Sequence, residues 1–222
     1  MERLIYIGIG TLVMMILSLL AHRKYNISLW KAVVLPVLLT VSGVLGAMIL
    51  AFVETGGNWG GISFYGSVLL IPILMIIVSI VLRMPYLKIM DLAAPQVCAM
   101  LAVMKMHCYD MHCCGGVYFY SNVLDRWVAF PSQIVESIVA ICIMIFLLIM
   151  DRRNMFKGGL YGVFFVTYGI LRFILNFFRS GIKPFVWFIP AGHLWSVISV
   201  IIGVIWLTIY FKKRGENYGD SI

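Results

Sequence analysis

Reactive side chains are concentrated in one short segment, residues 105–119, whose sequence is KMHCYDMHCCGGVYF. The side chains there that could bind a metal, carry a proton or form a disulfide are His107, Cys108, His112, Cys113 and Cys114. Imidazole nitrogens and thiolates are ligands that zinc prefers. However, the spacing HCxxxHCC matches no familiar zinc pattern, and ligands this crowded are not expected all to reach one ion, so we predict no metal ligands. Two interpretations stay open: a disulfide from Cys108 to Cys113 or Cys114, or thiols that pack in a turn bordered by glycines.

A second candidate is Arg172, in the middle of the apolar stretch TYGILRFILNFFR. Tyr168 lies four residues before it and Asn176 four residues after it, so the three side chains share one face if the stretch is helical. Arginine suits an anion site because its planar guanidinium binds phosphate oxygens in pairs and stays charged when desolvated. Two interpretations are open: an ion pair with Glu136 or Asp91 that holds helices together, or a site for a lipid phosphate. A cavity open to lipid beside Arg172 would favour the second.

Two further stretches carry polar groups at the ends of apolar runs. In FPSQIVES, Gln133 and Glu136 are three positions apart and share a helix face, so Glu136 is either a partner for Arg172 or a proton acceptor. In GGNWGGISFYGS, the glycines let either a ligand or another helix approach closely. Tyr65 is the side chain of that stretch with an acid–base function.

The surroundings of these groups are those of a membrane protein. The chain of 222 residues is 63% hydrophobic, only 12% of its residues are charged, and its mean hydropathy is +1.02. A soluble domain of this length needs far more polar surface, so soluble classes of protein are excluded. The net charge of +8 comes from basic clusters between apolar runs, which indicates membrane topology and not nucleic-acid binding.

Runs of about 20 mostly apolar residues predict about seven transmembrane helices. Their approximate ranges are 4–21, 29–53, 62–83, 89–104, 133–150, 158–178 and 188–211. The fourth run is short and contains Asp91, Pro95 and Gln96, so a re-entrant or half-buried helix is an alternative there. Without a repeat or a long linker, residues 1–222 are predicted to form a single domain, an all-α integral membrane protein.

Lysine and arginine residues predict the orientation, because they are enriched in cytoplasmic loops. One set of loops contains eleven of them, and the alternate set contains five. The N-terminus is therefore expected outside and the C-terminus in the cytoplasm. The segment 105–119 then faces the outer side, together with the loops around residues 54–61 and 179–188.

The order and spacing of six motifs resemble those of the bacterial prolipoprotein diacylglyceryl transferases. The motifs are GGISFYGS, DLAAP, KMHCYDMHCCGG, PSQIVES, YGILRFILNFFR and AGHLWSVIS, and they extend from about residue 56 to residue 205. The resemblance implies a helical protein with seven spans and its N-terminus outside, in agreement with the charges. It also implies the reaction, in which a diacylglyceryl group moves from phosphatidylglycerol to the lipobox cysteine thiol of a prolipoprotein, a thioether forms, and glycerol phosphate leaves.

Several positions that match family motifs carry a different residue here. Lys105 stands at the arginine of the family signature, which keeps the charge but loses the paired grip on a phosphate. Cys108 and Cys113 stand at its asparagine and acidic positions, and Gly116 stands at its closing glycine. Tyr65 replaces a histidine, so a group with a pKa of about 10 replaces a base that titrates near neutrality.

The resemblance also covers the last two spans. Tyr168 and Arg172 match a tyrosine and an essential arginine of the family, and Arg179 matches a further arginine. Gly192 and His193 stand at a Gly-Gln pair. Arg172 is therefore expected to hold the departing phosphate with help from Lys105 and Arg179, while Tyr168 and Tyr65 orient the headgroup.

The reaction also needs a base, because the nucleophile is the thiolate. The candidates are His107, His112 and Glu136, and the residues alone do not choose between them. The other residues expected to bind lipid are Cys108, Cys113, Gly116, Gln133, Gly192 and His193.

The resemblance implies partners and a location as well. The expected partners are phosphatidylglycerol, the signal peptide of a prolipoprotein with its lipobox cysteine, and the bilayer; no cofactor and no nucleic acid are expected. The expected location is the bacterial cell membrane, with the site open towards the outer leaflet. The alternatives are a membrane thiol-redox or metal-handling protein that uses residues 107–114, a transporter, and a catalytically inactive relative.

Overall fold

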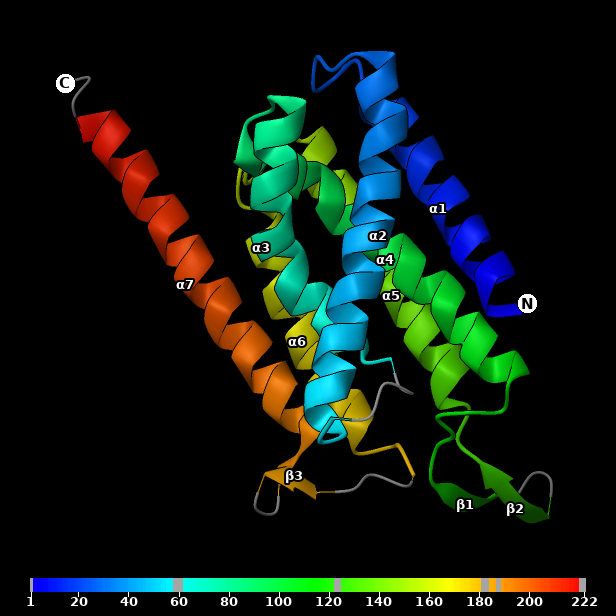
Figure 1. Ribbon diagram of the computed structural model, residues 1–222. Helices are drawn as coiled ribbons and strands as arrows, with labels where there is room; N and C mark the ends of the chain where they lie inside the picture. The colour runs from blue at the N-terminus through cyan, green and yellow to red at the C-terminus, as the bar shows by residue number, and fades with distance from the viewer. Residues whose placement is uncertain (1, 58–61, 122–124, 181–183, 187–188, 220–222) are drawn as a thin grey trace.

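The computed structural model describes residues 2–57, 62–121, 125–180, 184–186 and 189–219. This part of the chain forms seven α-helices and two small antiparallel sheets of two strands each (Figure 1). The helices are α1 (Glu2–Ala21), α2 (Leu29–Glu54), α3 (Phe64–Leu82), α4 (Tyr86–Asp110), α5 (Ser132–Arg152), α6 (Leu160–Asn176) and α7 (Ala191–Gly219). The strands are β1 (Tyr118–Ser121), β2 (Arg126–Ala129), β3 (Pro184–Val186) and β4 (Ile189–Pro190).

The apolar runs form helices because a helix pairs its backbone groups internally, and lipid offers those groups no partners. Six of the helices described are long and apolar enough to span a membrane. The seventh, α6, has 17 residues and is about 25 Å long, slightly less than the hydrocarbon core of about 30 Å. Most of its residues are buried among the other helices, so lipid surrounds little of it.

The predicted fourth span is wrong in its length. The chain was expected to be helical over 89–104, with a re-entrant segment as the alternative, whereas α4 has 25 residues and qualifies as a full span. Its mean hydropathy of 1.5 is the lowest of the six spans, and its buried share of 72% is the highest. Asp91, Pro95 and Gln96 are buried inside the protein, so the low hydropathy reflects a helix that faces other helices.

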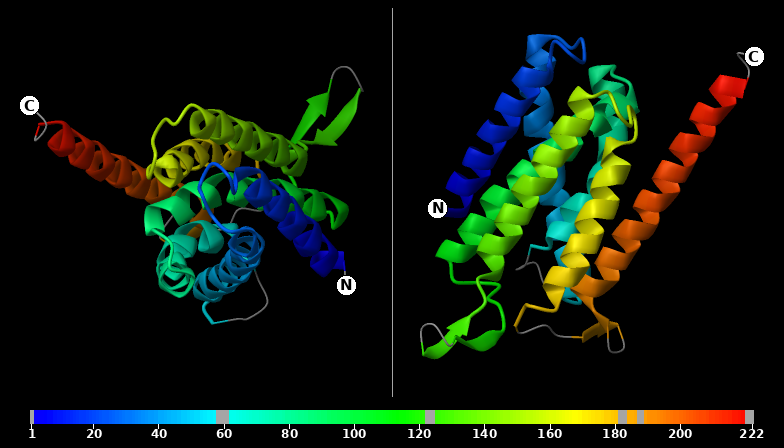
Figure 2. Two further views of the ribbon diagram at one scale, coloured as in Figure 1. Left: turned by 90° about the horizontal axis from the view of Figure 1, so that it is seen from above. Right: turned by 180° about the vertical axis from the view of Figure 1, so that it is seen from behind.

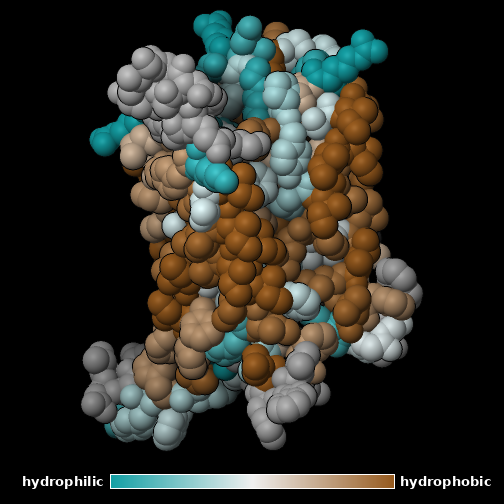
Figure 3. All heavy atoms as spheres, turned by 90° about the vertical axis from the view of Figure 1, so that its left-hand side faces the viewer, coloured by the Kyte–Doolittle hydropathy of each residue, from teal (hydrophilic) through white to brown (hydrophobic). Residues whose placement is uncertain are grey.

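The connections between the helices lie at two opposite ends of the bundle (Figure 1). The α1–α2, α3–α4 and α5–α6 connections and the C-terminal end of α7 lie at one end, and the two small sheets lie at the other. Most of the lysines and arginines lie at the first end. Lys183, which was expected at the opposite end, lies outside the described residues. Hydrophobic side chains cover the middle of the face seen in Figure 3, with hydrophilic groups towards both ends.

Pairs of helices pack most extensively as α6 with α7, α4 with α5, α2 with α3, and α1 with α4. The α7 helix packs against α6 from Gly192, next to Asn176, as far as Trp206, next to Gly162, and its C-terminal end diverges from the rest of the bundle (Figure 2). The α2–α3 pair crosses at Gly46 and Gly66, where a Cβ atom on Gly46 would lie 2.6 Å from the carbonyl oxygen of Gly66. Of the two interpretations of the glycine-rich stretch, close helix packing therefore applies to Gly66; residues 58–61 lie outside the described part.

Asp91 has a structural role at the start of α6. Its carboxylate is buried and accepts hydrogen bonds from the backbone N–H groups of Gly158 and Leu160, the latter at 3.0 Å. The first N–H groups of a helix have no partner within the helix, and the helix dipole favours a negative charge there. Asp91 therefore caps α6, the helix that carries Arg172, and is not the partner of that arginine.

Candidate active site

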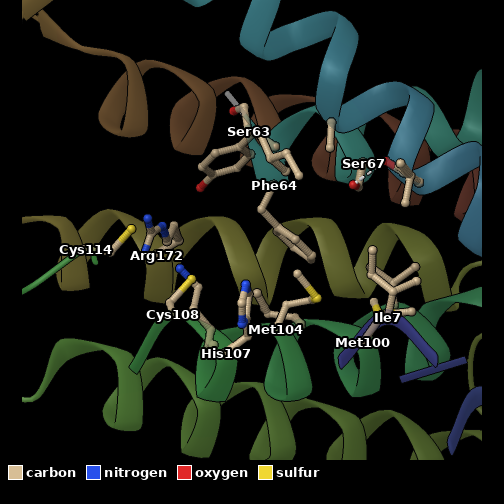
Figure 4. Close-up of a pocket in the computed structure, with 18 of the residues that line it drawn as sticks. Ile7, Ser63, Phe64, Ser67, Met100, Met104, His107, Cys108, Cys114 and Arg172 are labelled. Atoms are coloured by element: carbon tan, nitrogen blue, oxygen red, sulfur yellow. Dashed lines mark hydrogen bonds between the residues drawn. The ribbon is translucent and has the colours of Figure 1, made fainter. Parts of the chain in front are cut away.

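A cavity of about 620 Å³ lies in the half of the bundle nearer the two small sheets, and all helices except α5 border it. One part is lined by charged and polar groups, and Figure 4 shows Arg172, Cys108 and Cys114 gathered there. The other part is lined by apolar side chains such as Ile7 and Met100, which lie at the opposite side of the same view. The cavity is thus amphipathic along its length.

The charged part is built around the carboxylate of Glu136 on α5. Glu136 is buried and forms ion pairs with Lys105 at the end of α4 and with Arg172 on α6. The Nε atom of Arg179, just beyond α6, lies 3.8 Å from the same carboxylate. Of the two interpretations of Arg172, the structure thus shows both features, an ion pair with Glu136 and a cavity beside the guanidinium.

The three cations outnumber the carboxylate at this cluster by two charges. Lys105, Arg172 and Arg179 all line the cavity, whereas Glu136 lies behind them. Within the described residues, the buried Nε atoms of Arg172 and Arg179 have no hydrogen-bond partner. Buried donors without partners are costly, so the arrangement is suited to an anionic ligand that enters from the cavity.

Aromatic side chains form the wall next to Arg172. The ring of Tyr168 lies 5.6 Å from that of Tyr65 and 5.8 Å from that of Phe64, measured between centroids. The hydroxyl of Ser196 donates to the carbonyl of Gly192 at 2.6 Å, so the Tyr65 hydroxyl, 2.6 Å from Ser196, must donate to Ser196. Tyr65 is therefore held in place with its proton engaged and does not act as a base in this state.

The cysteine segment reverses the chain at the mouth of the charged part. Cys108 lies on the last turns of α4, and His112 and Cys114 have left-handed backbones, with φ of 50° and 60°. The sulfur atoms of Cys108, Cys113 and Cys114 consequently lie within 4.8 Å of one another. Three of the five candidate ligands thus converge in the described part of the chain, and His107 and His112 are not in this group.

The cysteines are free thiols, and so is each of the other two cysteines of the chain, all within the described residues. The disulfide interpretation is thus not the state that the structure shows. The thiol of Cys108 donates a hydrogen bond to Cys114, and the charges of Arg179 and Lys105 act in the same direction, so the pKa of Cys114 falls to about 5.

The chain matches the family described as prolipoprotein diacylglyceryl transferase over residues 4–209. The chain belongs to this family. This match confirms the family that the six motifs indicated. It also confirms, at the level of the family, the kind of enzyme that the resemblance implied.

Three relatives illustrate the similarity. The phosphatidylglycerol–prolipoprotein diacylglyceryl transferase 2 of Clostridium perfringens is 24% identical over 242 residues, which cover 97% of this chain and 93% of the relative. The transferase of Polaromonas naphthalenivorans is 27% identical over 70% of this chain and 62% of its own. That of Clostridium tetani is 26% identical over 58% of this chain and 56% of its own.

Most of the site residues expected from the diacylglyceryl transferase motifs meet at the cavity. Those that line it are Tyr65, Lys105, His107, Cys108, Cys113, Tyr168, Arg172, Arg179 and Gly192. These residues come from α3, α4, α6, α7 and the connections between helices, so the cavity depends on the assembled bundle.

Four of the expected residues are not part of the lining. Gln133 donates to the carbonyl of Cys113 at 2.6 Å, and a Cβ atom on Gly116 would collide with the carbonyl of Phe130, so both shape the connection between α4 and α5. His193 packs against the rings of Phe173 and Phe177. It follows Gly192, which faces the cavity, and successive residues of a helix point about 100° apart. Glu136, the fourth, acts on the cavity through the cations.

The three candidate bases differ in position. His107 is buried, lines the cavity, and has an Nδ1 atom without a hydrogen-bond partner among the described residues. His112 is exposed, and its Nδ1 atom lies 3.0 Å from the carbonyl of Tyr109. Glu136 is held by cations. Position therefore favours His107.

Sequence reasoning missed Glu54, the last residue of α2. Its carboxylate lines the cavity and accepts a hydrogen bond of 3.0 Å from Ser63, and no cation forms an ion pair with it in the described part of the chain. An acidic residue at the outer end of a predicted span, next to the glycine-rich stretch, was the signal that could have found it.

Proposed function

We propose that this chain transfers a diacylglyceryl group from phosphatidylglycerol to a prolipoprotein cysteine thiol. The observation that carries the proposal is the amphipathic cavity, with an excess of cations at one part and apolar side chains at the other. A phospholipid has the same two parts, an anionic headgroup and acyl chains. Family membership and the names of the relatives support the same reaction.

The phosphate is expected to bind Arg172 and Arg179, whose buried Nε atoms have no hydrogen-bond partner within the described residues. Phosphatidylglycerol carries one negative charge at its phosphodiester, and glycerol phosphate gains more as it leaves, because its second pKa is about 6. The two excess positive charges therefore match the leaving group better than the bound lipid. Such differential stabilisation is what lowers a reaction barrier.

The nucleophile is the thiolate of the prolipoprotein cysteine. His107 accepts the thiol proton, the sulfur forms a bond to the glyceryl carbon, and the carbon–oxygen bond to the phosphate breaks. The bonding electrons leave with glycerol phosphate, and the product is a thioether. Tyr65 and Tyr168 hold the wall of the headgroup site.

The orientation follows from charge. The end of the bundle that carries Arg23, Lys24, Arg83, Arg152 and Lys157 is placed in the cytoplasm, since lysine and arginine are enriched there. The cavity then lies towards the outer leaflet of the bacterial cell membrane. The N-terminus of this chain is on the same side, and the lipobox cysteine of a secreted prolipoprotein reaches the cavity there.

The test is a transfer assay in vesicles. Purified protein is incorporated into vesicles with phosphatidylglycerol, a peptide with a lipobox cysteine is added, and mass spectrometry measures the gain of a diacylglyceryl group. The wild-type chain and Arg152→Ala, an exposed arginine at the far end of the bundle, are expected to modify the peptide. Arg172→Ala is expected to be slower by about 100-fold or more, because one donor to a developing anion contributes that much. Equal rates for all three would contradict the phosphate site, and no product from any would contradict the function.

A further inference from the structure

We propose that Cys108, Cys113 and Cys114 bind a zinc ion whose fourth coordination position faces the cavity and takes the substrate thiol. The three sulfur atoms already lie within 4.8 Å of one another. Zinc binds thiolates at about 2.3 Å in a tetrahedron, which puts two sulfurs about 3.8 Å apart. The sulfurs therefore need to close by about 1 Å or less to bind a single ion.

The backbone around the three cysteines is held by groups other than the thiols. The carbonyl of Cys113 accepts from Gln133 at 2.6 Å, and the carbonyl of Cys114 accepts from Ser132 at 2.8 Å. The N–H of Cys113 donates to the carbonyl of Cys108 at 3.1 Å. The start of α5 thus holds the segment in its reversed conformation, and the sulfurs stay available to a ligand. Prepositioned ligands of this kind are what a metal site requires.

An odd number of thiols favours a metal over a disulfide. A disulfide would use two of the three sulfurs and leave the third unpaired, whereas one zinc ion uses all three. Three thiolates and Zn²⁺ carry one net negative charge, and Lys105 and Arg179 line the same part of the cavity. These cations stabilise the anionic complex. Cys113 is exposed, which gives an ion a path to the site.

The position of the cluster assigns it a role in the reaction, and this part rests on the proposed function. All three cysteines line the cavity that also contains Arg172 and His107 (Figure 4). Zinc sites with three protein ligands keep the fourth position open for water or substrate, and a thiol that binds there loses its proton. The thiol proton passes to His107, the sulfur attacks the glyceryl carbon, and glycerol phosphate leaves with the electron pair of the broken carbon–oxygen bond. This would supply the activation that Tyr65 cannot give.

The first measurement is metal content, independent of activity. Protein is purified under reducing conditions, supplied with zinc, and passed through a desalting column, and zinc is counted by mass spectrometry. We expect about one zinc ion per chain for the wild type and for Cys142→Ser, a free exposed cysteine on α5, and a small fraction of that for Cys108→Ser and Cys114→Ser. A cobalt-substituted wild type should show thiolate-to-cobalt absorption that changes when a lipobox peptide is added, but not when its cysteine is replaced by serine.

The outcomes separate this proposal from the function on which it rests. Wild-type protein with no more zinc than Cys108→Ser, or with a disulfide among the three cysteines, overturns the site, even if transfer proceeds. A zinc-free wild type that transfers at the full rate overturns the thiol-activating role; we expect a loss of about tenfold or more that zinc restores. Bound zinc with no transfer by any form of the protein supports the site and contradicts the proposed function instead. Binding of phosphatidylglycerol and the unfolding temperature of Cys108→Ser show whether that variant has folded.

Discussion

Glu136 is the side chain on which the charge balance of the cavity depends. It is buried, and the three cations that line the cavity share its carboxylate. The i, i+4 spacing of Tyr168, Arg172 and Asn176 was enough to predict that Arg172 belongs to a polar group. The choice of Glu136 over Asp91 as its partner was not predictable, because it depends on how α5 packs against α6.

Replacing Glu136 by glutamine should destabilise the protein. Glu136→Gln removes the charge that pairs with the buried Lys105 and Arg172, and breaking a buried ion pair in this way typically costs about 3–5 kcal/mol of the free energy of unfolding. Thermal unfolding in detergent measures the loss, with Glu2→Gln, an exposed residue of α1, as the control. An unfolding temperature equal to that of the wild type would show that the cations do not need this carboxylate.

Two histidines of one segment should respond differently to the same substitution. His107→Gln should lower the rate of diacylglyceryl transfer by about 100-fold or more, because it removes the proton acceptor that lines the cavity. His112→Gln should leave the rate nearly unchanged, since His112 is exposed and outside the lining. The transfer assay in vesicles measures both variants. A reversed order of effects would move the base to His112.

The conformation of the cysteine segment, residues 108–114, could be predicted only in part from its residues. Its spacing suggested that the five candidate ligands could not all reach one ion, but it did not show that two left-handed residues, His112 and Cys114, turn the chain so that the three cysteine sulfurs converge. A turn bordered by glycines was one interpretation of this segment, but its left-handed positions fall on His112 and Cys114 and not on the glycines, so the convergence of the sulfurs was not predictable. Glu54 was missed for a related reason, because only the assembled bundle brings the end of α2 to the cavity.

The crossing of α2 and α3 positions the aromatic wall of the cavity. Gly66 follows Tyr65, and a Cβ atom at position 66 would collide with the backbone of Gly46 on α2. Gly66→Ala should therefore push the two helices apart and destabilise the protein by about 1–3 kcal/mol, as overpacking usually does. Thermal unfolding and transfer rate measure the effect.

Gly8→Ala is the matched control for this crossing. Gly8 lies on α1, and a Cβ atom there would meet nothing within 4 Å, so its unfolding temperature should equal or slightly exceed that of the wild type. If Gly66→Ala were as stable as Gly8→Ala, the helices would have room at the crossing, and close packing would not be what fixes Tyr65.

Hydropathy predicted the location of each helix in the described residues, and the alternation of the spans predicted which connections share an end of the bundle. Hydropathy underestimated the length of α4, because Asp91, Pro95 and Gln96 face other helices and lower the hydropathy of a span that lipid hardly contacts. Hydropathy overestimated the length of α6, because the apolar residues beyond Asn176 belong to a connection and not to the helix. Such errors are expected where other helices, and not lipid, surround a helix.

The proposed orientation predicts which end of the bundle faces the outside. In a background without native cysteines, a single cysteine is placed by Arg126→Cys on β2 or by Lys157→Cys at the opposite end, both exposed positions. A maleimide that does not cross membranes should label the first variant in intact cells and the second only after permeabilisation. Labelling in the reverse order would contradict the orientation and place the cavity towards the inner leaflet.

The central claim is that Arg172 and its neighbouring cations hold the phosphate of a phospholipid from which this chain transfers a diacylglyceryl group. The most direct test is complementation in bacterial cells depleted of their own transferase, with the masses of their lipoproteins as the readout. The account predicts that the wild-type chain restores lipoproteins with a thioether-linked diacylglyceryl group, and that Arg172→Ala, present in the membrane in equal amount, does not. Unmodified lipoproteins with the folded wild type, or full modification with Arg172→Ala, would contradict it.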